Sequence, residues 1–132
     1  MIACADLCKI VEHRLGDANL LHQHKRDDGA QYLVGYAVEI ALKVRFCRNK
    51  GELDFPTTKA EFQNWKTKYG VWLKQHSLQN LADATGWDSS TLWFEWSQIT
   101  KWDVTMRYSH GFAKPGETSN MIAAAAVIVG AL

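Results

Sequence analysis

Residues 28–49 read DGAQYLVGYAVEIALKVRFCRN, and this stretch decides the fold. Its apolar side chains recur at intervals of four and three residues, at Leu33, Ala37, Ile40, Val44 and Cys47. That spacing places them on one face of an α-helix, where they form a continuous apolar seam. A second row at helical spacing runs beside the seam, at Tyr32, Tyr36, Glu39 and Lys43. Because the two rows together cover much of the helix surface, we expect this helix to lie at the centre of the protein.

The sequence on both sides of this stretch also favours helices. Apolar spacing, polar caps and glycine stops predict them over about residues 3–24, 59–69, 76–85, 92–99 and 120–132. Thr118 and Ser119 are the expected cap of the last helix. Residues 52–58 and 110–116 are expected to be loops, and the short segment 102–108 is ambiguous. Because no strands alternate with the helices, the sequence predicts an all-α helical bundle.

The composition fits one globular domain over residues 1–132. Hydrophobic residues make up 47% of the chain and charged residues 22%, which excludes a disordered chain. The formal net charge of +1 gives no overall argument for nucleic-acid binding, although a neutral sum can hide a local basic patch. The six tryptophans are expected to pack mainly in the core.

No segment of the sequence predicts export or membrane insertion. The N-terminus has no basic region followed by an apolar run, and the apolar residues 121–132 are fewer than the roughly 20 that a bilayer requires. Three cysteines cannot all pair within one chain, which favours free thiols in a reducing compartment. We therefore expect a cytoplasmic protein. No cluster of residues predicts a metal site or a cofactor.

Three segments of the chain carry distinctive motifs in a fixed order. Residues 32–43 read YLVGYAVEIALK, residues 76–86 read HSLQNLADATG, and Trp102 is followed by Arg107 and Tyr108. Together they resemble the second-helix signature, the His-x-Leu-x-x-Leu segment and the tryptophan with an Arg-Tyr pair of HEPN domains, the nucleotide-binding domains of higher eukaryotes and prokaryotes. The resemblance covers about residues 14–108.

This resemblance implies an up-and-down bundle of about five helices in a cytosolic protein that often forms a homodimer. It also implies a frequent partnership with a small nucleotidyltransferase in toxin–antitoxin or defence systems. Many HEPN proteins are metal-independent ribonucleases, whose signature is an arginine followed about four to six residues later by a histidine. Arg107 and His110 are separated by only two residues, so the chain resembles the branch that lacks the standard pair.

Glu39 is the first candidate site residue, because it is a carboxylate among apolar neighbours on the central helix. One interpretation places Glu39, Lys43, Tyr36, Arg107 and Tyr108 around a polar pocket that holds a phosphate or RNA. The other makes Glu39 part of a buried ion pair that fixes the helix packing, since a buried charge needs a partner. The second interpretation is favoured, because ion-pair networks are a commoner source of such clusters than active sites.

Arg107 and His110 are the candidate catalytic residues. On a helix they would share one face, where the arginine could bind a phosphate and the histidine could move a proton. These two functions are the minimum for metal-free cleavage of RNA, in which the 2′-hydroxyl attacks the adjacent phosphate. Because Gly111 follows at once, a histidine in a surface loop is the favoured interpretation of His110.

The sequence supports three hypotheses of function. The leading one is a nucleotide-binding, RNA-binding or partner-binding module. The first alternative is a metal-independent endoribonuclease that acts as a toxin, and the second is a purely structural or interaction subunit.

Overall fold

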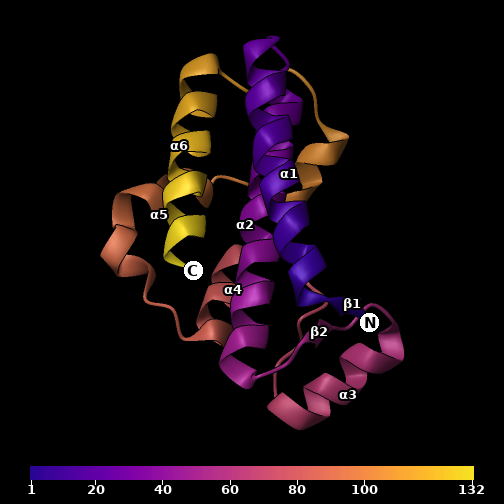
Figure 1. Cartoon of the computed structure of the whole chain (residues 1–132). Coiled ribbons are helices and arrows are strands. Elements are labelled where there is room, and N and C mark those ends of the chain that lie inside the picture. Colours follow the sequence, from indigo (N-terminus) through magenta and orange to yellow (C-terminus); the bar gives the residue numbers. More distant parts are fainter.

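The computed structural model describes residues 1–132, and helices make up most of it (Figure 1). Its α-helices are α1 (Cys4–Gln23), α2 (Asp27–Lys50), α3 (Lys59–Tyr69), α4 (Leu78–Thr85), α5 (Trp93–Ile99) and α6 (Pro115–Ala131). Two short 3-10 helices, η1 (Ser89–Leu92) and η2 (Val104–Tyr108), lie between α4 and α6. The all-α prediction is confirmed, with six α-helices instead of about five.

A small antiparallel sheet was not predicted from the sequence. Strand β1 (Ile2–Ala3) pairs with strand β2 (Asp54–Phe55), with Ile2 opposite Phe55 and Ala3 opposite Asp54. The backbone N–H of Cys4 adds a hydrogen bond of 2.8 Å to the carbonyl oxygen of Leu53. Residues 52–58, which were expected to be only a loop, therefore pair with the residues just before α1.

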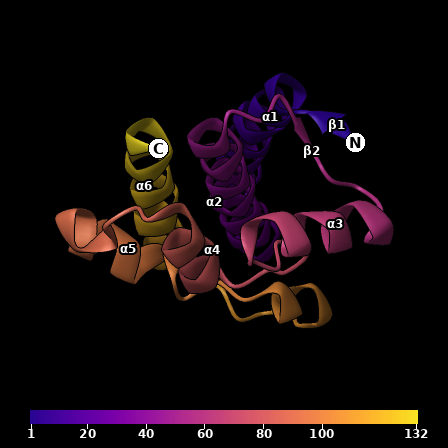
Figure 2. The ribbon, with the colours of Figure 1, turned by 90° about the horizontal axis from the view of Figure 1, so that it is seen from below.

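Helix α2 lies at the centre of the molecule, as predicted. Figure 2, which looks along the bundle, shows α1, α3, α4 and α6 arranged around it. The most deeply buried apolar row of α2 consists of Val34, Val38 and Leu42, whereas Leu33 and Ile40 of the predicted seam are only partly buried. Because neighbours pack on several sides of α2, one apolar stripe does not describe its buried surface.

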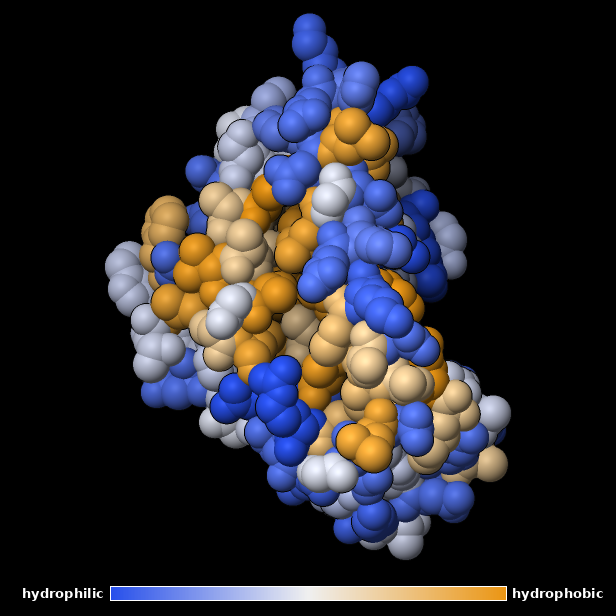
Figure 3. Space-filling view, viewed as in Figure 1, coloured by the Kyte–Doolittle hydropathy of each residue, from blue (hydrophilic) through white to orange (hydrophobic).

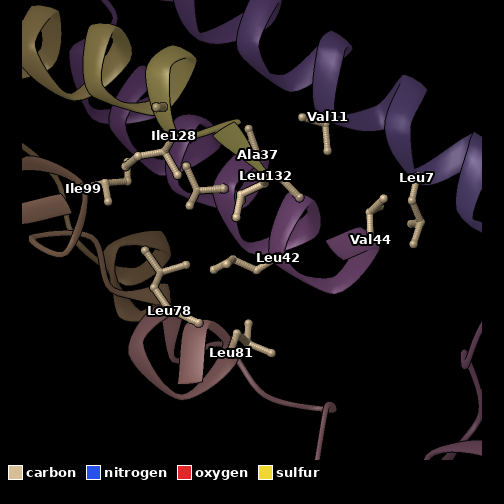
Figure 4. Packing of buried hydrophobic residues seen from close by; sticks show 14 of the residues in the cluster. Leu7, Val11, Ala37, Leu42, Val44, Leu78, Leu81, Ile99, Ile128 and Leu132 are labelled. Atoms are coloured by element: carbon tan, nitrogen blue, oxygen red, sulfur yellow. The ribbon is translucent and has the colours of Figure 1, made fainter. Parts of the chain in front are cut away.

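One hydrophobic core connects all six α-helices. Figure 4 shows Leu42 of α2 close to Leu78 and Leu81 of α4, and Ile99 of α5 beside Ile128 of α6. A fully buried leucine or isoleucine stabilises the fold by about 1.5–3 kcal/mol through the apolar surface that it removes from water. The 26 buried residues of this cluster come from every α-helix, so no helix folds on a core of its own.

Half of the six tryptophans confirm the prediction that they pack in the core. Trp65, Trp96 and Trp102 are buried, and Trp72 and Trp87 are partly buried against the same cluster. Trp93 does not fit the prediction, because 71% of its surface is exposed at the start of α5.

Helix α6 begins at Pro115 and not at residue 120, so its predicted start is wrong. Proline suits the first position of a helix, because its fixed φ is helical and its missing N–H is not needed there. The hydroxyl of Thr118, expected to cap the helix, is buried instead. Its Oγ1 accepts a hydrogen bond of 3.1 Å from Gln31 on α2 and so helps α6 to pack on the central helix. None of the helices has both the length and the apolar character needed to cross a lipid bilayer.

Candidate functional site

Glu39 of α2 is a buried carboxylate held by two basic side chains. It is 2% exposed. One turn further along α2, the Nζ of Lys43 donates a hydrogen bond of 2.6 Å to Oε1. The Nδ1 of His76, just before α4, lies 3.0 Å from Oε2. The favoured interpretation of Glu39 as a buried ion pair is confirmed, and the structure adds His76 to the pair.

The imidazole of His76 has a buried edge and an open edge. Its Nδ1 faces Glu39, yet 45% of the side chain is exposed. The ring borders a hollow of about 290 Å³ that Ser77, Gln79, Trp102 and Asp103 also line. A carboxylate at Nδ1 favours the tautomer that carries its proton there, which leaves Nε2 on the opposite side of the ring as an acceptor.

Tyr36 of α2 lies between His76 and Tyr32, which is one turn closer to the start of the helix. Its ring makes edge contacts with Tyr32, His76 and Trp102, at centroid distances of 5.1, 6.0 and 5.3 Å. Burial first, and then a hydrogen bond with Tyr32, raise the pKa of Tyr36 to about 12. The hydroxyl of Tyr36 therefore stays protonated at neutral pH and can donate a hydrogen bond.

Arg107 of η2 is exposed beside these tyrosines and takes part in no ion pair. Its guanidinium lies 4.9 Å from the ring centroid of Tyr108. Electrostatic interaction and hydrogen bonding with Tyr108, with smaller contributions from Tyr32 and Tyr36, raise the pKa of Arg107, so its guanidinium stays charged. Asp28 and Arg107 both line a second hollow, separate from the one beside His76. The carboxylate of Asp28 accepts hydrogen bonds there from the N–H groups of Gly111 and Ala113. The carboxylate of Asp28 is thus oriented towards these N–H groups, and Arg107 forms no ion pair with it.

Some of the predicted site residues come together and others do not. Tyr32, Tyr36, His76, Arg107 and Tyr108 form one surface along α2, which we call the arginine face. Lys43 is not free to bind a ligand there, because its ammonium is directed at Glu39 and lies 5.8 Å from the centroid of Phe55. Glu39 holds Lys43 and His76, and it makes no bond with Arg107.

His110 lies outside the helix that carries Arg107. Helix η2 ends at Tyr108, Ser109 has an extended backbone, and His110 is exposed in the segment that follows. The two candidate catalytic residues therefore do not share a helical face. His110 therefore lies in a surface loop, as expected from the glycine that follows it.

The contact between His76 and Glu39 is the part of the site that the sequence did not predict, since His76 was expected to cap or pack at the start of a helix. A signal was present, since His76 opens one of the three ordered motifs and stands just before Ser77, whose hydroxyl accepts a hydrogen bond from the N–H of Asn80 at the start of α4. Its contact with Glu39, however, depends on how α4 packs on α2, which no local pattern shows.

No protein-family model, no curated protein and no solved structure matches this chain.

Proposed function

We propose that the chain is a HEPN-like module that binds a nucleotide or RNA through the arginine face. The observation that carries this proposal is Arg107, an exposed guanidinium without an acidic partner and with tyrosines around it. A guanidinium binds phosphate oxygens through paired hydrogen bonds and stacks on bases, and tyrosine rings stack on bases as well. A ligand with a phosphate and an aromatic base matches this combination.

The free guanidinium of Arg107 supports an anionic ligand, although the net charge of the chain is only +1. Lys43 balances the charge of Glu39 behind the face. Asp103, which lines the hollow beside His76, accepts hydrogen bonds from the N–H and the hydroxyl of Thr105. Those bonds lower the pKa of Asp103, so its charge is stabilised by donors within the protein. Arg107 is the cation of this surface that is free to contact an anionic ligand, because Glu39 holds Lys43 and no carboxylate pairs with Arg107.

Binding to a single-stranded RNA oligonucleotide, measured by fluorescence polarisation, tests this function. Arg107→Ala is expected to weaken binding about tenfold or more, because a charge-assisted hydrogen bond contributes about 1.5–3 kcal/mol. Arg14→Ala is the matched control: Arg14 pairs with Asp17 on α1, which lies across α2 from η2 (Figure 2). Equal affinity of the two variants, or no RNA binding by the natural sequence, would contradict the proposal.

A metal-independent endoribonuclease is the second candidate, and the contact between Glu39 and His76 favours it. A histidine oriented by a carboxylate can take a proton from the 2′-hydroxyl of RNA, while Arg107 stabilises the phosphate under attack. In this proposal His76 replaces His110 as the proton-moving residue.

Incubation of the protein with total RNA and a metal chelator separates cleavage from binding. Cleavage is expected to stop in His76→Ala and in Arg107→Ala and to continue in His110→Ala. Binding without cleavage supports the binding module alone. A protein that neither binds nor cleaves RNA supports the third hypothesis, a structural or interaction subunit.

A second copy of the chain is the partner that the exposed apolar surface supports. Trp93 and Phe94 are 71% and 51% exposed and contact each other edge to face, and Val127 on the adjoining α6 is 47% exposed. We call these three residues the α5–α6 patch. Figure 3 shows hydrophobic surface over α6 and in the hollow between α6 and α1. We propose that the chain forms a homodimer through this patch. The proposal also includes a small nucleotidyltransferase as a partner and a location in the cytoplasm.

A further inference from the structure

A second group of reactive side chains lies where α1 ends and α2 and α6 begin, at the upper end of Figure 1. His22 is in the last turn of α1, and its Nδ1 lies 2.5 Å from Oδ1 of Asp27, the first residue of α2. The Nε2 of His22 lies 2.9 Å from Oγ of Ser119 on α6. Carboxylate, imidazole and hydroxyl thus form one chain of hydrogen bonds, and none of the three belongs to the arginine face.

From this geometry we propose that Ser119 is an activated nucleophile that accepts the acyl group of small esters. A serine hydroxyl is a weak nucleophile until a base takes its proton, and an imidazole serves best when a third group holds its ring. Here the third group is Asp27, which accepts the Nδ1–H of His22. Nε2 then accepts the hydrogen bond from the hydroxyl of Ser119.

The burial of the three residues matches their roles. The side chain of Asp27 is 12% exposed and that of His22 is 27% exposed, whereas Ser119 is an exposed residue. The group that orients the ring is shielded from water, and the group that attacks is open to it. Because Ser119 lies at the surface, a small ester in solution can reach its hydroxyl directly.

The reaction balances with water as the only co-substrate. The Oγ of Ser119 forms a bond with the carbonyl carbon of the ester while its proton moves to Nε2 of His22. The bond from that carbon to the alkoxy oxygen then breaks, and the leaving alcohol takes the proton. A water molecule gives a proton to Nε2 while its oxygen forms a bond with the acyl carbon. The bond from that carbon to Oγ of Ser119 then breaks, Nε2 returns the proton to Oγ, and the carboxylic acid leaves.

Backbone donors near Ser119 can stabilise the negative oxygen of the intermediate. Gly116 lies three residues before Ser119 on α6, so the two residues share a helix face. The N–H groups of Gly116 and Glu117 are in the first turn of α6, where no helical carbonyl accepts them. A side-chain carbon added at Gly116 would meet no atom within 4 Å, so this surface is open to a substrate. Such N–H groups at a helix start favour a developing oxyanion.

Labelling with a fluorophosphonate probe, followed by mass spectrometry, tests the proposal. The probe forms a bond between phosphorus and Oγ as fluoride leaves. We expect the label on Ser119, no label in Ser119→Ala, and labelling at least about tenfold slower in His22→Gln, because a positioned base contributes about a hundredfold or more to such a step. Ser97→Ala is the matched control, since it removes an exposed hydroxyl of α5 that donates only to the carbonyl oxygen of Phe94 in the same helix. Hydrolysis of p-nitrophenyl acetate is expected to follow the same order.

Three results would overturn the inference: no label on the natural sequence, a label that persists in Ser119→Ala, or equal labelling rates with and without His22. In each case the three side chains act only as a tether between helices. If His22→Gln does not fold, Asp27→Asn tests the same base, and its rate must also fall at least about tenfold. RNA binding by Ser119→Ala is expected to be unchanged, so this inference and the function of the arginine face fail separately.

Discussion

The carboxylate of Glu39 is shared by Lys43 and His76, which approach it from two different elements. Lys43 could be predicted as its partner, because residues four apart on a helix are neighbours. His76 is 37 positions away along the chain, so its contact with Glu39 could not be read from spacing. Spacing in the sequence also could not show that Arg107 forms no ion pair, because its neighbours are set by the folded surface.

Removal of the Glu39 carboxylate is expected to destabilise the protein strongly. In Glu39→Ala the ammonium of Lys43, whose side chain is 12% exposed, loses its counter-charge in the interior. Breaking a buried ion pair in this way costs about 3–5 kcal/mol in the free energy of unfolding, which urea denaturation measures. Glu12→Ala, at an exposed position of α1, is the control and is expected to change stability by less than about 0.5 kcal/mol. The double variant Glu39→Met with Lys43→Met should recover much of the loss; equal stability of Glu39→Ala and the control would contradict the buried pair.

Gly35 is the position where the smallest added side chain is expected to do most harm. A Cβ on Gly35 would lie 2.1 Å from the indole of Trp102, which is 5% exposed and donates a hydrogen bond of 3.0 Å to the carbonyl oxygen of Tyr32. Gly35→Ala must displace this rigid ring, at a cost of about 1–3 kcal/mol.

The matched control for Gly35→Ala is Gly16→Ala. Gly16 lies in α1 with no atom within 4 Å of an added Cβ, so the better helix propensity of alanine is expected to stabilise the protein by about 0.5–1 kcal/mol. Thermal and urea denaturation of both variants give the comparison. The prediction requires changes of opposite sign, and stabilisation by both substitutions would refute the close packing of Trp102.

At the scale of the helices, local sequence signals worked where a helix end depends on its own residues. Thr58 and Gly70 mark the two ends of α3, since the Thr58 hydroxyl accepts from the N–H of Glu61 and Gly70 has a left-handed backbone with φ of 73°. The predicted start of α6 is wrong because neither hydroxyl caps the helix. Thr118 bonds with Gln31 of α2 and with the carbonyl oxygen of Lys114, and Ser119 bonds with His22 of α1. A threonine or serine looks the same in the sequence whether it caps a helix or binds a distant side chain.

The start of α3 is expected to lose stability in acid. Hydrogen bonds from the backbone N–H groups of Thr57 and Thr58 to Glu61 lower its pKa from 4.5 to about 2. Because this pKa is lower in the folded protein, the stabilisation is fully present above about pH 4.5 and is lost as the pH falls towards about 2. Urea denaturation of the natural protein and of Glu61→Gln should therefore differ at neutral pH and converge in acid. A difference that does not vary with pH would count against the charged form of Glu61.

At the scale of the whole molecule, the sequence could predict an all-α bundle around α2 but not the arrangement of its surfaces. The apolar spacing of residues 28–49 marks the central helix, because burial on several sides requires apolar residues on several faces. Strands of two residues, such as β1 and β2, leave no periodic signal. Both candidate sites join side chains that are far apart in the chain, so each depends on the order in which the helices pack.

Self-association is expected to depend on the α5–α6 patch. Trp93→Asp places a charge in the centre of the proposed dimer interface, where an unpaired charge is costly, and should convert a dimer into a monomer. Light scattering coupled to size-exclusion chromatography measures the mass directly. Leu53→Asp is the control, because Leu53 is 82% exposed but lies between α2 and β2, away from the patch. A natural protein that is monomeric at all concentrations tested would exclude the homodimer.

The unequal exposure of the tryptophans gives the protein an internal optical probe. Trp93 is 71% exposed, while Trp65, Trp96 and Trp102 are each at most 8% exposed. A small water-soluble quencher such as iodide therefore reaches the indole of Trp93 much more easily than those of the other three. Among these four tryptophans, the emission that iodide quenches comes from Trp93. If subunits pair through the α5–α6 patch, this quenchable emission is expected to decrease as the protein concentration rises, and no attached dye is needed to follow it.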